Sequence, residues 1–300
     1  MVEPAFTPKV DRLEVSAYTV PTETPESDGT FAWTETTLVL VQVASCGVVG
    51  LRYSFADVAT ANLIDAHLRP GIVGYNPLNI PELWSSMVRT IRNLGRPGIC
   101  SMAIAAVDNA LWDLKARLLH LCVADLLGRA YPYIPAYGSG GFTSYSNSEL
   151  KRQLTGWIDD GLTTVKMKIG TDPISDVARV RSARDARMLE ANAVDVLQAD
   201  ATRCAGITGF LAAGNLSASF STPFSARTAP SLHAHAACSL HCAINVEYFF
   251  DHYRIEQTFF DGALVPSGGM LRPDSRRLGF GLECKLPDME KYRVYGNVTA

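Results

Sequence analysis

The chain has 300 residues, of which 47% are hydrophobic and 19% are charged, and its formal net charge is −3. A chain of this length and composition can bury a sizeable core, and it more often forms two domains or one barrel than a single small fold. Its lysines and arginines are scattered, so we expect no nucleic-acid partner and no anionic membrane partner. No stretch approaches the ~20 apolar residues of a membrane span, and the start of the chain does not read as a secretion signal. A cytoplasmic protein is therefore expected.

The first part of the chain predicts a small sheet followed by helices. Alternation over residues 12–20 and the β-branched run at 36–43 predict two strands, with a polar, mobile loop at 22–29 between them. From 55 to 121 the spacing of apolar residues becomes helical, most clearly after Ser101, which is a candidate N-cap. Strands followed by helices indicate a segregated α+β unit.

After Gly128 short strands alternate with helices. Strands are predicted at 134–137, 163–169, 194–199 and 244–249, and helices at 148–160, 175–190 and after Gly206. This alternation is typical of a parallel sheet or a barrel. A complete barrel needs eight such units of roughly 30 residues, so the chain after residue 130 supplies enough for only about five or six.

Two lysines in the strand predicted at 163–169 are the first candidates for chemistry. Lys166 and Lys168 are two residues apart, so a strand places them on the same face. Inside a barrel each ammonium group would lower the pKa of the other, which would make one of them a plausible base at neutral pH. The alternative is an edge strand that shows both lysines to solvent, and spacing alone favours that alternative.

Two carboxylates accompany the later strands. Asp200 follows the strand at 194–199, where barrel enzymes keep their active sites, although a helix cap is an equally good interpretation. Glu247 lies within the apolar strand at 244–249, where an inward charge must be paired or functional.

The histidines and cysteines predict no metal site. The seven cysteines are dispersed without CxxC spacing, which suits reduced thiols better than disulfides. The segment from His233 to Cys242 combines histidines and cysteines, but zinc pairs usually have tighter spacing, so packing is the better interpretation.

Five segments together resemble a known family. They are AIAAVDNALWDLKARLLHLCVADLLG (103–128), TTVKMKIG (163–170), VDVLQADATRCAGITGFL (194–211), APSLHAH (229–235) and VEYFFDHYRIE (246–256). By these segments the chain resembles the enolase superfamily, in its mandelate racemase/muconate lactonizing enzyme-like branch. The resemblance implies an α/β plus α+β fold, in which an N-terminal α+β capping domain is followed by an enolase-type (β/α) TIM-like barrel, here incomplete.

The resemblance also implies where the domains lie and how the chain associates. We place the capping domain at 1–128, with the tail at about 265–300 packing back on it, and the truncated barrel at 129–264. Family members commonly form oligomers, so a homo-oligomer is a further expectation.

The resemblance assigns roles to the candidate residues. Lys168 corresponds to the base that removes the proton α to a carboxylate, and Lys166 to its electrostatic helper. Asp200 matches the acid that orients a catalytic histidine, and Glu247 matches the residue that hydrogen-bonds the substrate carboxylate or the enolate. Substrate contacts are expected from Thr22, the glutamate beside Pro25, Trp33 and Arg203. The implied activity is a racemase or dehydratase of a hydroxy acid or acid sugar, with Mg²⁺ neutralising the carboxylate as the enolate forms.

One departure from the family concerns the metal. Only 31 residues separate Lys168 from Asp200, whereas the three intervening units, which bear the family's metal ligands, would take roughly 70 to 90. The join falls near 186–187, and the nearby Asp185 and Glu190 belong to a predicted helix, so they cannot rebuild an oxygen cage. Mg²⁺ is therefore expected for the family but not for this chain.

Further departures concern the base and the backbone. Arg227 stands where the family has its catalytic histidine, and arginine stays protonated, so it cannot act as a base. Ala205 stands where the family usually has a glycine, and it would be strained if φ is positive there.

These departures predict impaired catalysis. The alternatives are a non-catalytic relic that serves in oligomerisation and a binding module for small carboxylates that uses Lys166, Lys168 and Glu247. Losing three strands also predicts low stability, aggregation or a rearranged sheet in which the strand before Asp200 pairs with the strand of Lys168.

Overall fold

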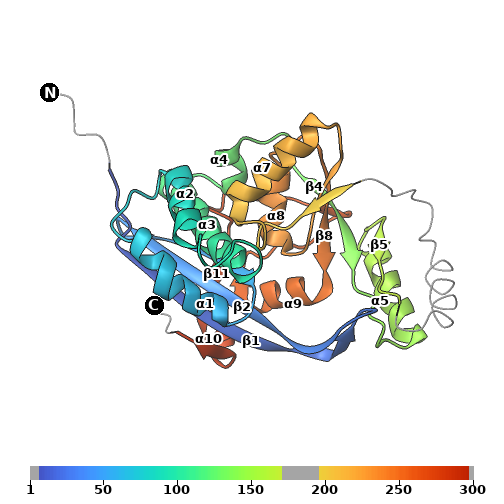
Figure 1. Ribbon diagram of the computed structural model, residues 1–300. Coiled ribbons are helices and arrows are strands. Elements are labelled where there is room, and N and C mark those ends of the chain that lie inside the picture. The colour runs from blue at the N-terminus through green and yellow to red at the C-terminus, as the bar shows by residue number, and fades with distance from the viewer. Residues whose placement is uncertain (1–6, 171–195, 297–300) are drawn as a thin grey trace.

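The computed structural model describes residues 7–170 and 196–296 and contains two main sheets with their helices (Figure 1). The first sheet is antiparallel, in the order β12-β1-β2-β3. Its elements and the helices that follow are β1 (Arg12–Ser27), β2 (Ala32–Ser45), β3 (Val48–Phe55), α1 (Ala59–Leu63), α2 (Ile80–Thr90), α3 (Ile99–Leu118) and α4 (Val123–Leu127), with helical turns at Ile64–Leu68 and Arg69–Gly71. The predicted α+β capping unit is confirmed.

The second sheet has the order β10-β4-β8-β7-β6, with β5 beside β4. Its parallel strands are β4 (Ile134–Ser139), β5 (Val165–Lys166), β6 (Leu197–Ala199), β7 (Phe224–Ala226) and β8 (Ala243–Phe249). The other elements are α5 (Asn147–Asp159), α7 (Gly206–Ser219), α8 (Pro230–Ala237), α9 (Phe250–Phe259), β9 (Phe260–Asp261), β10 (Met270–Leu271), β11 (Glu283–Cys284), α10 (Leu286–Glu290) and β12 (Arg293–Tyr295). Near the end of the chain, β12 pairs with β1 of the first sheet.

The parallel sheet does not close within the described residues. β5 pairs with β4, and β6 pairs with β7. β5 and β6 therefore lie at opposite ends of the sheet. The incomplete barrel is confirmed, whereas the predicted pairing of the Asp200 strand with the Lys168 strand is wrong. β5 follows β4 through α5, and β7 follows β6 through α7, and strands joined by one helical crossover usually lie side by side. The helix predicted at 175–190 and the join at 186–187 lie outside the described residues.

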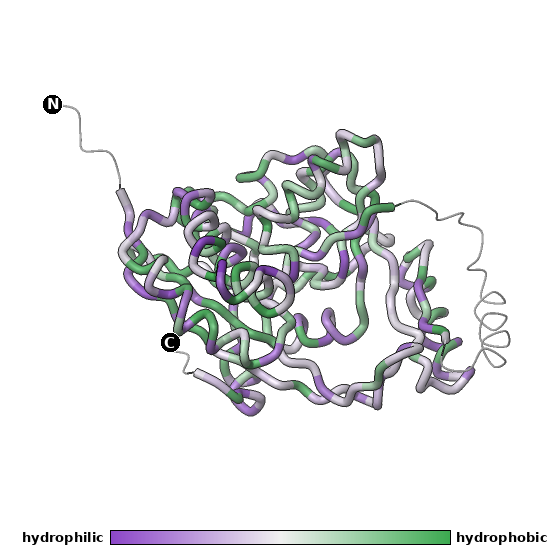
Figure 2. Tube along the Cα trace, in the orientation of Figure 1, coloured by the Kyte–Doolittle hydropathy of each residue, from purple (hydrophilic) through white to green (hydrophobic). Residues whose placement is uncertain are grey.

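The capping sheet is buried on both faces, which explains its long apolar run. Leu38 and Leu40 belong to the core shared with the parallel sheet, whereas Val39 and Val41 belong to the core under α3. Successive residues of a strand face opposite sides, so a strand that is buried on both faces has apolar residues at successive positions. Figure 2 shows the hydrophobic colour concentrated where this sheet meets its helices.

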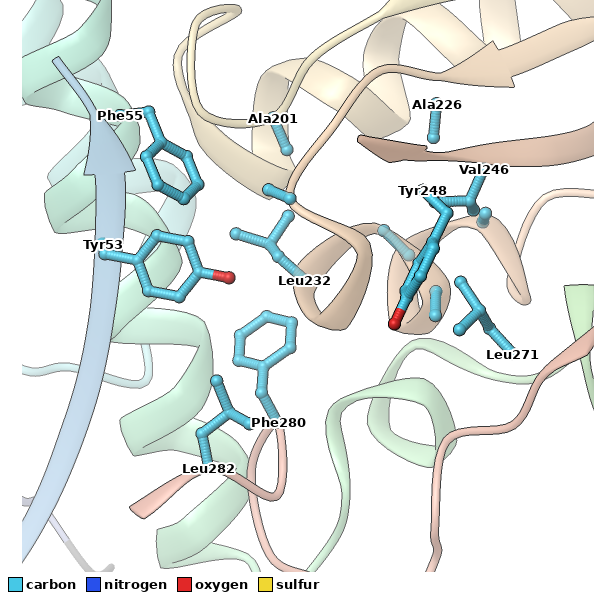
Figure 3. Close-up of a cluster of buried hydrophobic side chains, with 14 of the residues drawn as sticks. Tyr53, Phe55, Ala201, Ala226, Leu232, Val246, Tyr248, Leu271, Phe280 and Leu282 are labelled. Atoms are coloured by element: carbon cyan, nitrogen blue, oxygen red, sulfur yellow. The ribbon is translucent and has the colours of Figure 1, made fainter. Parts of the chain in front are cut away.

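The core between the two sheets fixes how the capping unit sits on the barrel unit. Tyr53 and Phe55 project from β3 toward Leu232 and Phe280 (Figure 3). The Tyr53 hydroxyl donates to the buried Glu256 of α9, whose other oxygen accepts from Ser231. Apolar packing and this buried polar link together hold the ends of the parallel strands under the capping sheet.

The loop predicted at 22–29 is wrong, because β1 continues through it to Ser27. Glu26 pairs with Trp33 across the hairpin, and the Trp33 indole donates to its carboxylate at 2.9 Å. Ser27 and Thr143 hydroxyls are 2.6 Å apart, and Thr36 hydrogen-bonds Asp251 of α9. These contacts tie the hairpin tip to the barrel unit, where Figure 1 shows it reaching α5.

The predicted start of α3 is also displaced. The helix begins at Ile99, and Ser101 lies inside its first turn, where its hydroxyl donates to the Arg96 carbonyl. Gly98 takes a φ of 75°, a left-handed conformation that ends the preceding turn and lets the helix begin earlier. Within the described residues no helix is long and apolar enough to cross a membrane.

Candidate functional site

A cavity of about 520 Å³ lies between the capping unit and the carboxyl ends of the parallel strands. The capping unit contributes Asp28, Phe31, Trp33, Glu35, Thr36, Thr37, Phe55, Ala56 and Asp57. The other unit contributes Lys168, Arg203, Arg227, Thr228, Glu247, Phe249 and His252. Its size is that of a small-molecule site, and its position is where barrel proteins bind their ligands.

Glu247 is the centre of a buried polar cluster. It is 1% exposed, and its Oε1 accepts from Ser139 Oγ at 2.6 Å and from Lys166 Nζ at 2.9 Å. Because β8 lies beside β4 and β4 lies beside β5, three neighbouring strand ends supply these groups. Within the described residues Glu247 Oε2 is buried without a hydrogen-bond partner. One carboxylate oxygen is thus satisfied, and the other is left to accept a donor.

Lys168 lies two residues beyond β5, on the cavity wall. Its backbone N–H donates to the Gly141 carbonyl at 3.0 Å, and its ammonium group lies 5.8 Å from the centre of the Phe249 ring. Burial lowers the pKa of Lys168 first, and the positive charge of Lys166 lowers it further. Both lysines approach Glu247, as a shared strand face requires.

Asp200 holds two arginines at the ends of β6 and β7. Its Oδ2 lies 3.2 Å from Arg227 Nη1 and 3.5 Å from Arg203 Nε. Its Oδ1 accepts from the Thr202 N–H at 2.8 Å and from the Thr202 hydroxyl at 2.7 Å. The arginines line the cavity while Asp200 fixes them from behind, so the cavity receives two guanidinium groups in a fixed place.

His233 is buried beside Asp200 but is not available as a base. Its Nδ1 lies 2.7 Å from the Thr228 carbonyl, to which it donates, and its Nε2 accepts from the Ala201 N–H at 2.7 Å. Burial lowers the pKa of His233, and burial lowers the pKa of His235 to about 3. Both histidines are structural residues of α8.

Ala205 has the positive φ at which strain is expected. Its φ is 66°, and Gly206, which begins α7, has a φ of 86°. The left-handed conformation suits glycine and costs a residue with a Cβ. The Ala205 carbonyl accepts from the Trp84 indole at 2.8 Å, which helps to hold this turn.

The predicted substrate contacts divide into two groups. Trp33 and Arg203 line the cavity, whereas Thr22 and the glutamate beside Pro25 are not among the described residues that line it. The next residues of β1, Glu23 and Thr24, border a different cavity of about 340 Å³ against α5 and α9. The cause is the extension of β1, which carries the predicted loop past the site.

The sequence alone missed three residues of the site. Ser139, Phe249 and His252 were not singled out from the sequence. Phe249 is the last residue of β8 and the N-cap of α9, and His252 follows three residues later, so both lie where β8 passes into α9. Their position just after the candidate Glu247 was the available signal.

The described residues do not fit a Mg²⁺ site. Across 7–170 and 196–296, no three His, Cys, Asp or Glu side chains are grouped to hold a metal ion. Asp200 and Glu247, the carboxylates at the strand ends, are already paired with cations. Mg²⁺ prefers several oxygen ligands in near-octahedral geometry, which this arrangement does not provide.

Fold and site together define an enolase-type protein, with a capping sheet over the carboxyl ends of a parallel sheet. Residues 13–128 match the mandelate racemase/muconate lactonizing enzyme N-terminal domain, and residues 185–289 match the enolase C-terminal domain-like family. The structure of a mandelate racemase/muconate lactonizing enzyme-like protein from Rubrobacter xylanophilus is 39% identical, with a TM-score of 0.92 over 95% of this chain and 100% of that chain. The chain belongs to the mandelate racemase/muconate lactonizing enzyme family of the enolase superfamily.

Curated relatives give the range of known chemistry. The chain is 31% identical over 183 residues to a 3,6-anhydro-alpha-L-galactonate cycloisomerase of Streptomyces coelicolor, covering 59% of this chain and 51% of that protein. It is 26% identical over 190 residues to an L-talarate/galactarate dehydratase of Salmonella typhimurium, covering 59% of this chain and 48% of that protein. The chain thus spans about half the length of these curated relatives.

Proposed function

We propose that this chain binds the carboxylate of a small hydroxy acid or acid sugar in the cavity, without metal-dependent turnover. The observation that supports this most is the convergence of Lys168, Arg203 and Arg227 on one cavity whose strand-end carboxylates already have cationic partners. Asp200 takes only part of the donors of each guanidinium, so the remaining N–H groups can meet the carboxylate of a ligand. The relatives named above act on acid sugars by their names, which fits a ligand of this class.

Loss of turnover is supported by two features of the chain. Arg227 occupies the place of the histidine that Asp200 would orient, and a guanidinium stays protonated. The interval of 31 residues between Lys168 and Asp200 is too short for three further barrel units of roughly 30 residues.

The rival proposal is a metal-dependent racemase or dehydratase. One observation favours it, because Lys168 is a lysine of lowered pKa that lines the cavity beside Glu247, as a base for α-proton removal should. The two proposals agree on the ligand class and differ on Mg²⁺ and on turnover.

Titration calorimetry with galactarate, in chelator and again in Mg²⁺, tests the binding proposal. We expect the same affinity in both buffers and a loss of at least about tenfold in Lys168→Ala, because charge-assisted contacts are among the stronger polar interactions. Lys151→Ala is the matched control, since that lysine is exposed on α5. Binding only in Mg²⁺, or equal affinity in both lysine variants, would contradict the proposal.

Domain boundaries and cellular location are lesser proposals. We place the capping domain at 1–128 and the barrel unit at 129–264, and the pairing of β12 with β1 supports a tail that returns to the capping domain. The seven cysteines are free, which suits the reducing cytoplasm.

A further inference from the structure

His252 is a cavity residue that the family resemblance did not assign. It lies on α9, three residues after Phe249, and both line the cavity together with Lys168 and Glu247. It is only 6% exposed, and its exposed part lines the cavity. A histidine placed this way, beside the lysine and the glutamate of the site, can contact a bound ligand.

The His252 ring is held by packing and not by hydrogen bonds. It stacks on Phe55 of the capping unit at a centroid distance of 3.5 Å and an interplanar angle of 16°, and it meets Phe249 edge-on at 4.9 Å. Within the described residues its Nδ1 is buried without a partner, which leaves Nε2 as the nitrogen that can meet a ligand. A buried polar group without a partner is costly unless a ligand or water completes it.

The protonation of His252 limits what it can do. Burial lowers its pKa well below the ordinary value, and the charges of Arg227 and Arg203 lower it further. The ring is therefore neutral at physiological pH, so it offers one donor and one acceptor and no positive charge. Such a group suits a hydroxyl, which can donate and accept, better than a carboxylate.

Glu247 Oε2, in the same unit of the site as His252, is a second group that calls for a ligand. It is a buried acceptor without a partner among the described residues, so it also calls for a donor. The cations of the cavity, Lys168, Arg203 and Arg227, suit the carboxylate end of a ligand. His252 Nε2 and Glu247 Oε2 suit hydroxyls on the rest of it.

We propose that His252 hydrogen-bonds a hydroxyl group of the acid bound in the cavity and thereby selects hydroxylated acids over their deoxy analogues. This inference rests on the proposed function, because it requires that an acid binds beside Lys168. It adds a specificity residue to that site, contributed by α9 and braced by the capping unit.

The test compares two probes in calorimetry with chelator present: galactarate, and adipate, which has the same carbon chain without hydroxyl groups. His252→Phe keeps an aromatic ring against Phe55 but removes both nitrogens. We expect it to weaken galactarate binding about five- to tenfold, the size of one hydrogen bond, and to change adipate binding less than about twofold. His241→Phe, at an exposed position, is the control and should change neither.

The outcomes separate this inference from the proposed function. An equal loss for both probes, or no loss for galactarate, overturns the role of His252 while leaving carboxylate binding intact. If the unchanged protein binds neither probe, the proposed function itself fails, and this inference with it. Histidine ¹⁵N NMR of the unchanged protein gives a reading that does not depend on a variant folding: galactarate, and not adipate, should shift the His252 Nε2 resonance.

Discussion

At the scale of single residues, Ala205 is a local conflict, because it is an alanine with a φ of 66°. Replacing it by glycine removes the steric cost of the left-handed conformation, which exceeds the loss of one buried methyl. We expect Ala205→Gly to stabilise the protein by about 0.5 to 1 kcal/mol in urea unfolding. Ala212→Gly, at an exposed position inside α7, should destabilise it by about 1 kcal/mol. The same sign for both variants would contradict this explanation.

Glu26 makes the stability of the hairpin depend on pH. Burial is the largest cause, and the charge of Asp251 the second, of a rise in its pKa from 4.5 to about 8. The folded state therefore holds a proton that the unfolded chain releases, so this contribution is complete below about pH 4.5 and is lost as pH rises to about 8. Glu26→Gln should melt like the unchanged protein near pH 5 and at a higher temperature near pH 9.

Asp108 limits how much of the pH dependence of stability Glu26→Gln can remove. Burial raises its pKa to about 7, so it contributes a decline in stability of the same sign in an overlapping range. Some slope should therefore remain in Glu26→Gln. A variant whose melting temperature falls with pH as steeply as that of the unchanged protein would show that Glu26 is not the cause.

Residue identity predicted part of the site and could not predict the rest. Strand periodicity predicted that Lys166 and Lys168 share a face, whereas the strand order that brings Glu247 beside Lys166 cannot be read from the sequence of either strand. His252 was not singled out, because the Phe55 ring that stacks on it comes from β3, which is distant in the sequence. Thr22 and the glutamate beside Pro25 were expected at the site from the resemblance and the predicted loop, whereas β1 continues through this segment and pairs with β2 on both sides of an irregularity between Pro21 and Glu26.

At the scale of elements, packing of α3 on β3 depends on Gly50. A Cβ at this position would lie 2.3 Å from the Leu114 backbone nitrogen, closer than a Cβ can approach. Gly50→Ala should therefore push the helix from the sheet and cost about 1 to 3 kcal/mol or more in urea unfolding.

Gly156 supplies the matched control for that prediction. It lies in α5, and a Cβ there would meet nothing within 4 Å. Gly156→Ala should therefore stabilise the protein by about 1 kcal/mol, because alanine favours a helix. If both alanine variants stabilise the protein, contact between α3 and β3 is looser than described.

Element types were largely predictable, and their boundaries were less so. The helix predicted at 148–160 is α5, whose N-terminus is fixed by a capping box between Ser146 and Glu149, a purely local signal. The strand predicted at 163–169 shortens to Val165–Lys166, because β5 has β4 as its single described neighbour. A strand at a sheet end has fewer ladder bonds to extend it, and the sequence of the strand itself does not reveal that position.

At the scale of the whole molecule, the capping unit is complete and the parallel sheet is open at β5 and β6 within the described residues. The cavity nevertheless forms, because the strands that supply Lys168, Glu247, Arg227 and Asp200 are present and ordered as neighbours. Binding and turnover can therefore separate in this chain. Lys168, Arg203 and Arg227, which we propose receive a carboxylate, line the cavity, while Arg227 stands where the family resemblance implies the histidine of the Asp200 dyad.

Exchange of an α-proton is the most direct test of that separation. Galactarate is incubated with the protein in D₂O, with Mg²⁺ and with chelator, and deuterium at the carbon beside the carboxylate is followed by NMR. Removing a metal from enolate chemistry costs several kcal/mol, and each 1.4 kcal/mol is about a factor of ten in rate. We predict no exchange above the protein-free rate in either buffer, although galactarate binds in both. Mg²⁺-dependent exchange that disappears in Lys168→Ala would contradict the account and would establish a working metal-dependent enzyme.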